Sequence, residues 1–159
     1  MTLEIKKYPD SVLKTRAKEV EEMDQGIREL AQDMIETMIA KDGVGLAANQ
    51  VGVLKRIIAV QTEAGPQVFI NPEIIQRSRE TIFDQEGCLS LPKSLYFNIK
   101  RAKWVEIKAL DITGKKVQMR AGDLTARIFQ HEIDHIDGIM IINRIGFWQK
   151  IKIKKQLKY

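Results

Sequence analysis

The segment QHEIDH, residues 130–135, constrains the fold more than any other part of the chain. It contains His131 and His135, the only two histidines in the sequence, with Glu132 directly after the first. On an α-helix, positions i and i+4 lie on one face, so both imidazoles can present a nitrogen to a single cation. Glu132 lies beside this stripe, where it can act as a general base on a metal-bound water. The segment therefore predicts a helix that carries two ligands of a metal site.

The third ligand has to be sought elsewhere, because a catalytic site of this type usually has three protein ligands and an open position for water. The run HEIDHIDGIMI begins like an extended metalloprotease motif, but Ile141 stands where a further histidine would follow. No histidine or glutamate occurs after His135, so the ligand lies upstream or is Asp137. Upstream, Cys88 is the only cysteine, and a thiolate is a strong ligand for zinc or ferrous iron. We therefore expect the ligand set Cys88, His131 and His135.

The composition is that of a globular protein from a reducing compartment. Hydrophobic residues make up 44% of the chain and charged residues 30%, and no apolar run approaches the roughly 20 residues needed to span a bilayer. The N-terminus has no apolar core of the signal-peptide type, and a single cysteine excludes an internal disulfide framework. We expect a cytoplasmic monomer that does not bind a membrane.

The spacing of apolar residues predicts one α+β domain over residues 1–159. A helix is expected over 24–40, where apolar residues recur at i, i+3, i+4 and i+7 and Asp24 is the N-cap. A second helix should run from Asp123 to about Asp137 and carry the two histidines, and a third should begin near Gly146, although IKIK there alternates like a strand. Strands are expected over residues 56–61, 67–70, 73–82, 104–111 and 115–120. The expected architecture is mixed or antiparallel β-sheets packed around the central H-E-x-x-H helix, with an N-terminal and a C-terminal helix.

Three segments together resemble the signature motifs of the peptide deformylases: GVGLAANQ (43–50), EGCLS (86–90) and QHEIDH (130–135). INPEI (70–74) and DHIDG (134–138) are also similar to family sequence, so the resemblance covers nearly the whole chain. It implies a hydrolase that removes the formyl group from the N-terminal formylmethionine of newly synthesised polypeptides and releases formate.

The resemblance also implies roles for individual residues. Cys88, His131 and His135 would bind the metal, with water as the fourth ligand, and Glu132 would take the water proton and pass it to the leaving amine. The side-chain amide of Gln50 and the backbone N–H of Leu89 would donate to the developing oxyanion. The expected cofactor is one divalent metal ion, Fe²⁺, with Zn²⁺, Ni²⁺ or Co²⁺ as replacements.

For the substrate, N-formylmethionyl peptides, the resemblance implies a binding edge and a pocket. The extended segment after Cys88 and the backbone from Gly43 to Gly45 would hold the peptide as an added strand. The candidates for the methionine pocket and for a nearby substrate contact are Val44, Leu124, Ile128 and Arg101. For Val44, Leu124 and Ile128, ordinary core packing is the alternative. Asn49 departs from the proline that often precedes the motif glutamine, and we expect an effect on loop stiffness.

The end of the chain is basic. After Asp137 there is no acidic residue, whereas the net charge of the whole chain is +5. The positive residues of this part are Arg144, Lys150, Lys152, Lys154, Lys155 and Lys158. In the bacterial forms that the chain resembles, such a C-terminal helix is implicated in docking to the ribosome, which makes ribosome contact an expectation here. The alternative is a solvated, lysine-rich helix.

Two other functions fit parts of the pattern. A metallopeptidase can use the same H-E-x-x-H helix, but the missing downstream ligand disfavours it. A basic RNA-binding module with a structural metal would normally fill all four positions with protein ligands, and this chain offers one cysteine and two histidines.

Overall fold

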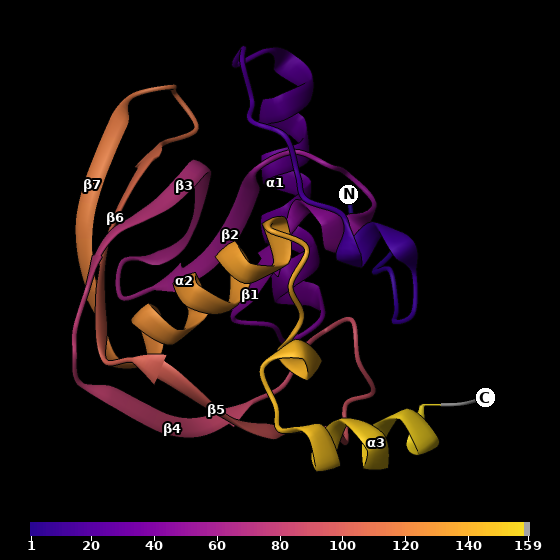
Figure 1. The fold of residues 1–159 in the computed structure, drawn as a ribbon. Helices are drawn as coiled ribbons and strands as arrows, with labels where there is room; N and C mark the ends of the chain where they lie inside the picture. Colours follow the sequence, from indigo (N-terminus) through magenta and orange to yellow (C-terminus); the bar gives the residue numbers. More distant parts are fainter. Residues whose placement is uncertain (158–159) are drawn as a thin grey trace.

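The structure is a computed structural model that describes residues 1–157, and Figure 1 shows its helices and strands. The three α-helices are α1 (Gln25–Ala40), α2 (Asp123–Ile136) and α3 (Phe147–Gln156). Short 3₁₀ turns are η1 (Ser11–Lys14), η2 (Ala48–Val51) and η3 (Ile141–Asn143). The strands are β1 (Gly45–Ala47), β2 (Ile57–Thr62), β3 (Gly65–Arg77), β4 (Thr81–Glu86), β5 (Phe97–Ala102), β6 (Trp104–Leu110) and β7 (Lys116–Gly122).

The strands form two antiparallel sheets around α2. The larger has the order β1-β2-β3-β6-β7, and the smaller is the pair β4-β5. In Figure 1, α2 lies at the centre of the molecule, between the large sheet and the β4-β5 ribbon. This is the α+β architecture expected from the sequence, in which α1 precedes the strands along the chain and α3 follows them.

Strand β2 is buried on both faces, which explains its continuous apolar sequence. Ile57 and Ala59 pack in the cluster that contains the buried face of α1, whereas Ile58 and Val60 pack in the cluster that contains α2. Successive side chains of a strand point to opposite faces, so the alternation assigns one face of the sheet to each helix. Each fully buried isoleucine contributes on the order of 2 kcal/mol. The sheet thus holds α2, with its histidines, as part of the core.

The helix ends were predicted more accurately than the strands. Asp24 caps α1 by accepting a hydrogen bond from the Ile27 N–H at 2.8 Å, as expected. Gly138 follows α2 with φ +77°, and a Cβ there would lie 2.6 Å from the carbonyl oxygen of Lys14. Glycine therefore both ends the helix and allows the N-terminal segment to pack against that end.

Some predicted strands need correction. The pattern predicts one strand over 73–82, but β3 ends at Arg77 and β4 begins at Thr81. Strands β1 and β5 are not predicted at all, and β5 is the partner of β4. The basic C-terminal segment, by contrast, is the helix that was expected there, and its Ile153 side chain is buried. None of the helices among residues 1–157 combines the length and the apolar character that crossing a bilayer requires.

Candidate metal centre and active-site cleft

His131 and His135 lie on one face of α2 with their nitrogens facing each other. Their Nε2 atoms are 3.2 Å apart, and both side chains are buried. Two neutral imidazoles can share that distance only if one donates a proton to the other, whereas both lone pairs can point at one cation. The i, i+4 spacing therefore produces the convergence of nitrogen atoms that the sequence predicts.

Cys88 completes the group from a different part of the fold. It follows β4 in the loop before β5, and its Sγ lies 3.2 Å from Nε2 of His135. The donor atoms of Cys88, His131 and His135 lie within 4.8 Å of one another. Asp137, the other candidate for the third ligand, instead pairs with Arg56 at 2.7 Å and lies outside this group.

The donor set fits a single divalent metal ion. One thiolate and two imidazole nitrogens suit zinc, ferrous iron and similar cations, and three protein ligands leave a position for water. Within the described residues, the buried Oε2 of Glu132 has no hydrogen-bond partner, which is expected of a group whose partner is a water or a substrate. The residues present are therefore those that a hydrolytic metal site requires.

Glu132 lies against a position where only glycine fits. Its side chain is buried, and a Cβ on Gly45 would lie 2.3 Å from its Oε1. Burial raises the pKa of Glu132 to about 7, against the opposing effect of the charge on His131. A carboxyl group with a pKa near neutrality can both accept and donate a proton during one reaction.

Gln50 is held so that its amide N–H₂ faces the cysteine. Its Oε1 accepts a hydrogen bond from the Ala47 N–H at 2.8 Å, which fixes the orientation of the amide. Its Nε2 then lies 3.1 Å from Oγ of Ser90 and 3.5 Å from Sγ of Cys88. The amide is thus a donor aimed at the space beside the candidate metal position.

A cleft of about 750 Å³ opens over these groups. Its lining includes the predicted residues Gly43, Val44, Gly45, Gln50, Cys88, Leu89, Leu124, Ile128, His131 and Glu132. Ile128 is buried, whereas Val44 and Leu124 are 48% and 63% exposed. Strand β1 is the edge strand of the large sheet and borders the cleft, so its outer side is available to an extended peptide.

Arg101 does not lie in the cleft. It is buried, and its guanidinium donates to the carboxylate of Glu86 at 2.9 Å and to Asp134 at 2.6 Å. Asp134 in turn accepts a hydrogen bond from Arg144 at 2.7 Å. The structure therefore brings Arg101 behind the candidate metal ligands, among charged groups, and not to the lining of the cleft.

Sequence reasoning missed the contacts that Glu86 and Asn49 make around the candidate ligands. Glu86 lies with Oε2 3.8 Å from Nδ1 of His131, on the side away from the other ligands. Burial opposes ionisation of Glu86, but His131 and Arg101 outweigh it and lower the pKa of Glu86 to about 2. Asn49 donates its side-chain N–H to the backbone carbonyl of His135 and so ties η2 to the end of α2. The signals in the sequence were the place of Glu86 in the EGCLS motif, two residues before Cys88, and the departure at Asn49, directly before Gln50, whose contact with α2 was not foreseen.

A helix-borne H-E-x-x-H beside a cysteine thiol, at the floor of a cleft, is typical of a metal-dependent hydrolase. The family model of the polypeptide deformylases matches residues 2–150. A peptide deformylase of Dictyoglomus thermophilum is 51% identical over 144 residues, which cover 91% of this chain and 93% of that protein. The chain belongs to the peptide deformylase family, metal-dependent hydrolases that remove the N-formyl group from nascent polypeptides.

Solved structures of the family have the same fold. The peptide deformylase of Thermotoga maritima matches with a TM-score of 0.88 and 40% identity, over 92% of this chain and 99% of that one. The enzyme of Ehrlichia chaffeensis in complex with actinonin matches with a TM-score of 0.91 and 37% identity, over 99% of both chains. The similarity thus extends over the cleft and both sheets.

Proposed function

We propose that this chain acts as one catalytic domain over residues 1–159 and hydrolyses the formyl amide bond of its substrate, with Cys88, His131 and His135 as metal ligands. The observation that carries the proposal is the convergence of these three donors beside Glu132 at the floor of the cleft. A divalent ion bound there would polarise the formyl carbonyl and lower the pKa of a water molecule. The remaining steps depend on groups of the chain itself.

Glu132 is proposed as the proton carrier. Its Oε2 has no partner among the described residues, so it is free to accept the proton of the attacking water. Burial raises the pKa of Glu132, and a carboxyl group of raised pKa can give that proton to the leaving amine. Gly45 keeps the carboxylate in place, because no side chain separates it from β1.

Gln50 and Leu89 are proposed as the donors to the oxyanion. The hydrogen bond from Ala47 leaves Nε2 of Gln50 as the end of the amide that faces Cys88. The Leu89 N–H, one residue beyond Cys88, donates to no acceptor among the described residues. Removing one such donor typically costs about 3 kcal/mol of transition-state stabilisation.

The substrate is proposed to bind as an additional strand along Gly43–Gly45, with the methionine side chain over Ile128. The exposed apolar surfaces of Val44 and Leu124 at the cleft are what such a side chain would cover. Arg101 is proposed as a positioning residue and not as a substrate contact, since its guanidinium is occupied by Glu86 and Asp134.

The decisive experiment compares formyl-Met-Ala, acetyl-Met-Ala and a peptide with an internal bond after methionine. We expect formate release from the first substrate alone. Cleavage of the internal bond without formate release would instead support a metallopeptidase. Anaerobic and aerobic preparations test the proposed Fe²⁺: activity and iron should be lost together in air, whereas a stable active form would indicate zinc, nickel or cobalt.

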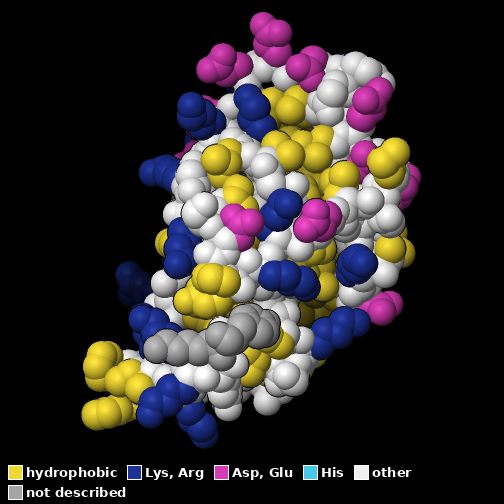
Figure 2. Space-filling model, turned by 90° about the vertical axis from the view of Figure 1, so that its right-hand side faces the viewer, with side chains coloured by type: hydrophobic (Ala, Val, Ile, Leu, Met, Phe, Trp, Pro, Cys, Tyr) yellow, Lys and Arg dark blue, Asp and Glu magenta, His cyan; other side chains and the backbone are white. Residues whose placement is uncertain are grey.

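We also propose that the protein works as a monomer in the cytoplasm, where nascent chains are made, and that α3 contacts the ribosome. On the face shown in Figure 2, Lys and Arg side chains surround the region of α3, and acidic side chains gather at the opposite end. Lys152 and Lys155 are exposed on α3. Replacing both with glutamate should weaken co-sedimentation with ribosomes and leave cleavage of short peptides unchanged.

A further inference from the structure

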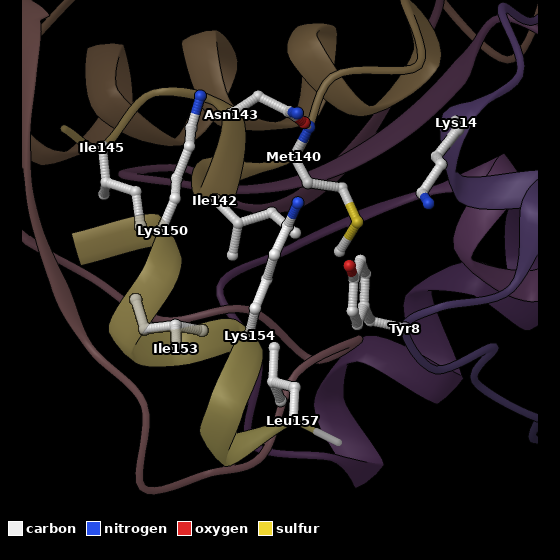
Figure 3. A pocket seen from close by; sticks show the side chains of 10 residues that line it. All are labelled: Tyr8, Lys14, Met140, Ile142, Asn143, Ile145, Lys150, Ile153, Lys154 and Leu157. Atoms are coloured by element: carbon white, nitrogen blue, oxygen red, sulfur yellow. The ribbon is translucent and has the colours of Figure 1, made fainter. Parts of the chain in front are cut away.

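A second cavity lies between α3 and the N-terminal part of the chain, outside the cleft. Its volume is about 230 Å³, and Figure 3 shows the side chains that line it. They are Tyr8, Lys14, Met140, Ile142, Asn143, Ile145, Lys150, Ile153, Lys154 and Leu157. They come from η1 and the segment before it, from the residues around η3, and from α3 and the residue that follows it. None belongs to the proposed metal site.

The lining combines three cations with no acid. Lys150 and Lys154, one helical turn apart on α3, approach the cavity from one side, and Lys14 lies across from them (Figure 3). Within residues 1–157 none of these lysines forms an ion pair; Lys14 makes a cation–π contact, its Nζ 5.2 Å from the centre of the Tyr8 ring. Like charges brought into one concavity repel each other, and an anion placed among them would remove that cost.

The floor of the cavity is apolar. Ile153 and Leu157 are buried on the face of α3 that also carries the two lysines, and Met140 and Ile145 are buried opposite them. Lysines beside buried aliphatic side chains are usual on an amphipathic helix, and here both kinds of side chain also line one hollow. The arrangement offers a cationic rim and an aliphatic interior to the same ligand.

We propose that this cavity binds a free anionic amphiphile, with its head group among Lys14, Lys150 and Lys154 and its aliphatic tail on Ile153 and Leu157. The volume of about 230 Å³ corresponds to roughly eight groups of the size of a water molecule, at about 30 Å³ each. This volume is enough for a short aliphatic chain and too small for a peptide helix or for a lipid with two long chains. The ribosome contact proposed above uses Lys152 and Lys155, which are not part of the lining.

The two cavities are neighbours, so a test has to distinguish them. Lys7 lines the cleft and Tyr8 lines the second cavity, and the Tyr8 N–H donates to the carbonyl of Ser90 at 2.9 Å. Octane-1-sulfonate is a suitable probe, because a sulfonate is a poor metal ligand and does not favour the metal site. Methanesulfonate carries the head group alone, and octan-1-ol carries the tail without the charge.

The experiment follows the backbone amides of the metal-loaded full chain by NMR during titration with each probe, below the micelle concentration. We expect saturable shifts at Asn143 and Ile145 with octane-1-sulfonate, and much weaker binding of the other two probes. The double variant Lys150→Gln, Lys154→Gln should weaken binding about tenfold, whereas Lys152→Gln, on the same helix outside the lining, should bind as the unmodified chain does.

Four results would overturn the proposal. Equal binding of methanesulfonate would mean a charged surface only, and equal binding of octan-1-ol would mean an apolar hollow only. Shifts confined to cleft residues such as Gly45 and Leu89 would assign the probe to the active site. Binding to phosphatidylglycerol vesicles without binding of the free probe would indicate a membrane surface. The amide shifts of α3 in each variant, recorded without a probe, check that this helix is still folded.

Discussion

Replacing Gly45 with alanine should impair the reaction without removing the metal. The new Cβ would lie 2.3 Å from Oε1 of Glu132 and 2.8 Å from Cγ2 of Ile128, whereas ordinary contact begins near 3.4 Å. The carboxylate therefore has to move by about 1 Å, and a misplacement of that size can cost about 100-fold in rate. This corresponds to about 2.7 kcal/mol in the activation free energy. We expect kcat for formyl-Met-Ala to fall by about two orders of magnitude.

The matched control is Gly122→Ala. Gly122 is the N-cap of α2, the same helix that carries Glu132, and a Cβ there would meet no atom within 4 Å. Its formate release should stay within about a factor of two of the unmodified chain, because neither a contact nor a strained backbone is introduced.

The assay combines kcat and KM for formate release with the metal content of each purified variant. The reasoning requires that Gly45→Ala keeps a full complement of metal, because none of the three ligands is displaced by the new methyl group. An unchanged kcat would refute the idea that Gly45 positions Glu132. A loss of activity in proportion to a loss of metal would show that the substitution acts on the ligands instead.

The other predictions concern the ligands and the residues behind them. Glu132→Gln should bind metal normally and lose about 10²- to 10⁴-fold in kcat, and full activity would remove Glu132 from the mechanism. Cys88→Ser should weaken metal affinity, measured by competition with a chelator, by more than the roughly 10- to 100-fold typical of outer-shell partners; unchanged affinity would exclude the thiol as a ligand. Glu86→Gln should lower the free energy of unfolding of the metal-free protein by about 3 kcal/mol at pH 7, since it leaves the buried charge of Arg101 with one partner fewer. Against the opposing effect of burial, His131 and Arg101 lower the pKa of Glu86 from 4.5 to about 2 on folding, so its contribution is present above pH 4.5 and lost toward pH 2. Urea unfolding between pH 5 and pH 2 should therefore show a weaker pH dependence in Glu86→Gln, and equal slopes would contradict this assignment.

The sequence predicted the elements whose pattern is local. Helices α1 and α2 follow from apolar spacing and from their end residues, and the i, i+4 spacing brings His131 and His135 together. Strand β5 was missed because Arg101 points inward and interrupts the alternation of Phe97 and Ile99 with polar residues. The break between β3 and β4 was missed because Ser78-Arg79-Glu80 contains none of the glycine, proline, asparagine or aspartate residues that usually mark a turn.

The residues of the candidate site also fall into those that the sequence predicts and those that depend on the packing of the fold. Cys88 could be proposed by elimination, since the chain has one cysteine and no later histidine or glutamate. The pairing of Glu86 with Arg101 depends on the register of β4 and β5, and that of Arg101 with Asp134 depends on how α2 packs on this ribbon. Neither relation leaves a trace in sequence spacing, and so Arg101 was expected at the substrate although it lies behind the ligands.

Glu86, Arg101 and Asp134 form a buried charged network, and the position of Glu86 gives this network a role besides stabilising the fold. A buried ion pair is often no more stabilising than apolar side chains of the same volume, because both charges must be desolvated. The carboxylate, however, lies 3.8 Å from Nδ1 of His131, a distance at which it favours a proton on that nitrogen without a direct hydrogen bond. A proton on Nδ1 leaves the lone pair on Nε2, the atom that faces His135 and the proposed metal. Arg101 favours the ionised form of Glu86 and is itself held by Asp134, so these buried charges favour one tautomer of a candidate ligand from the side away from Cys88 and His135.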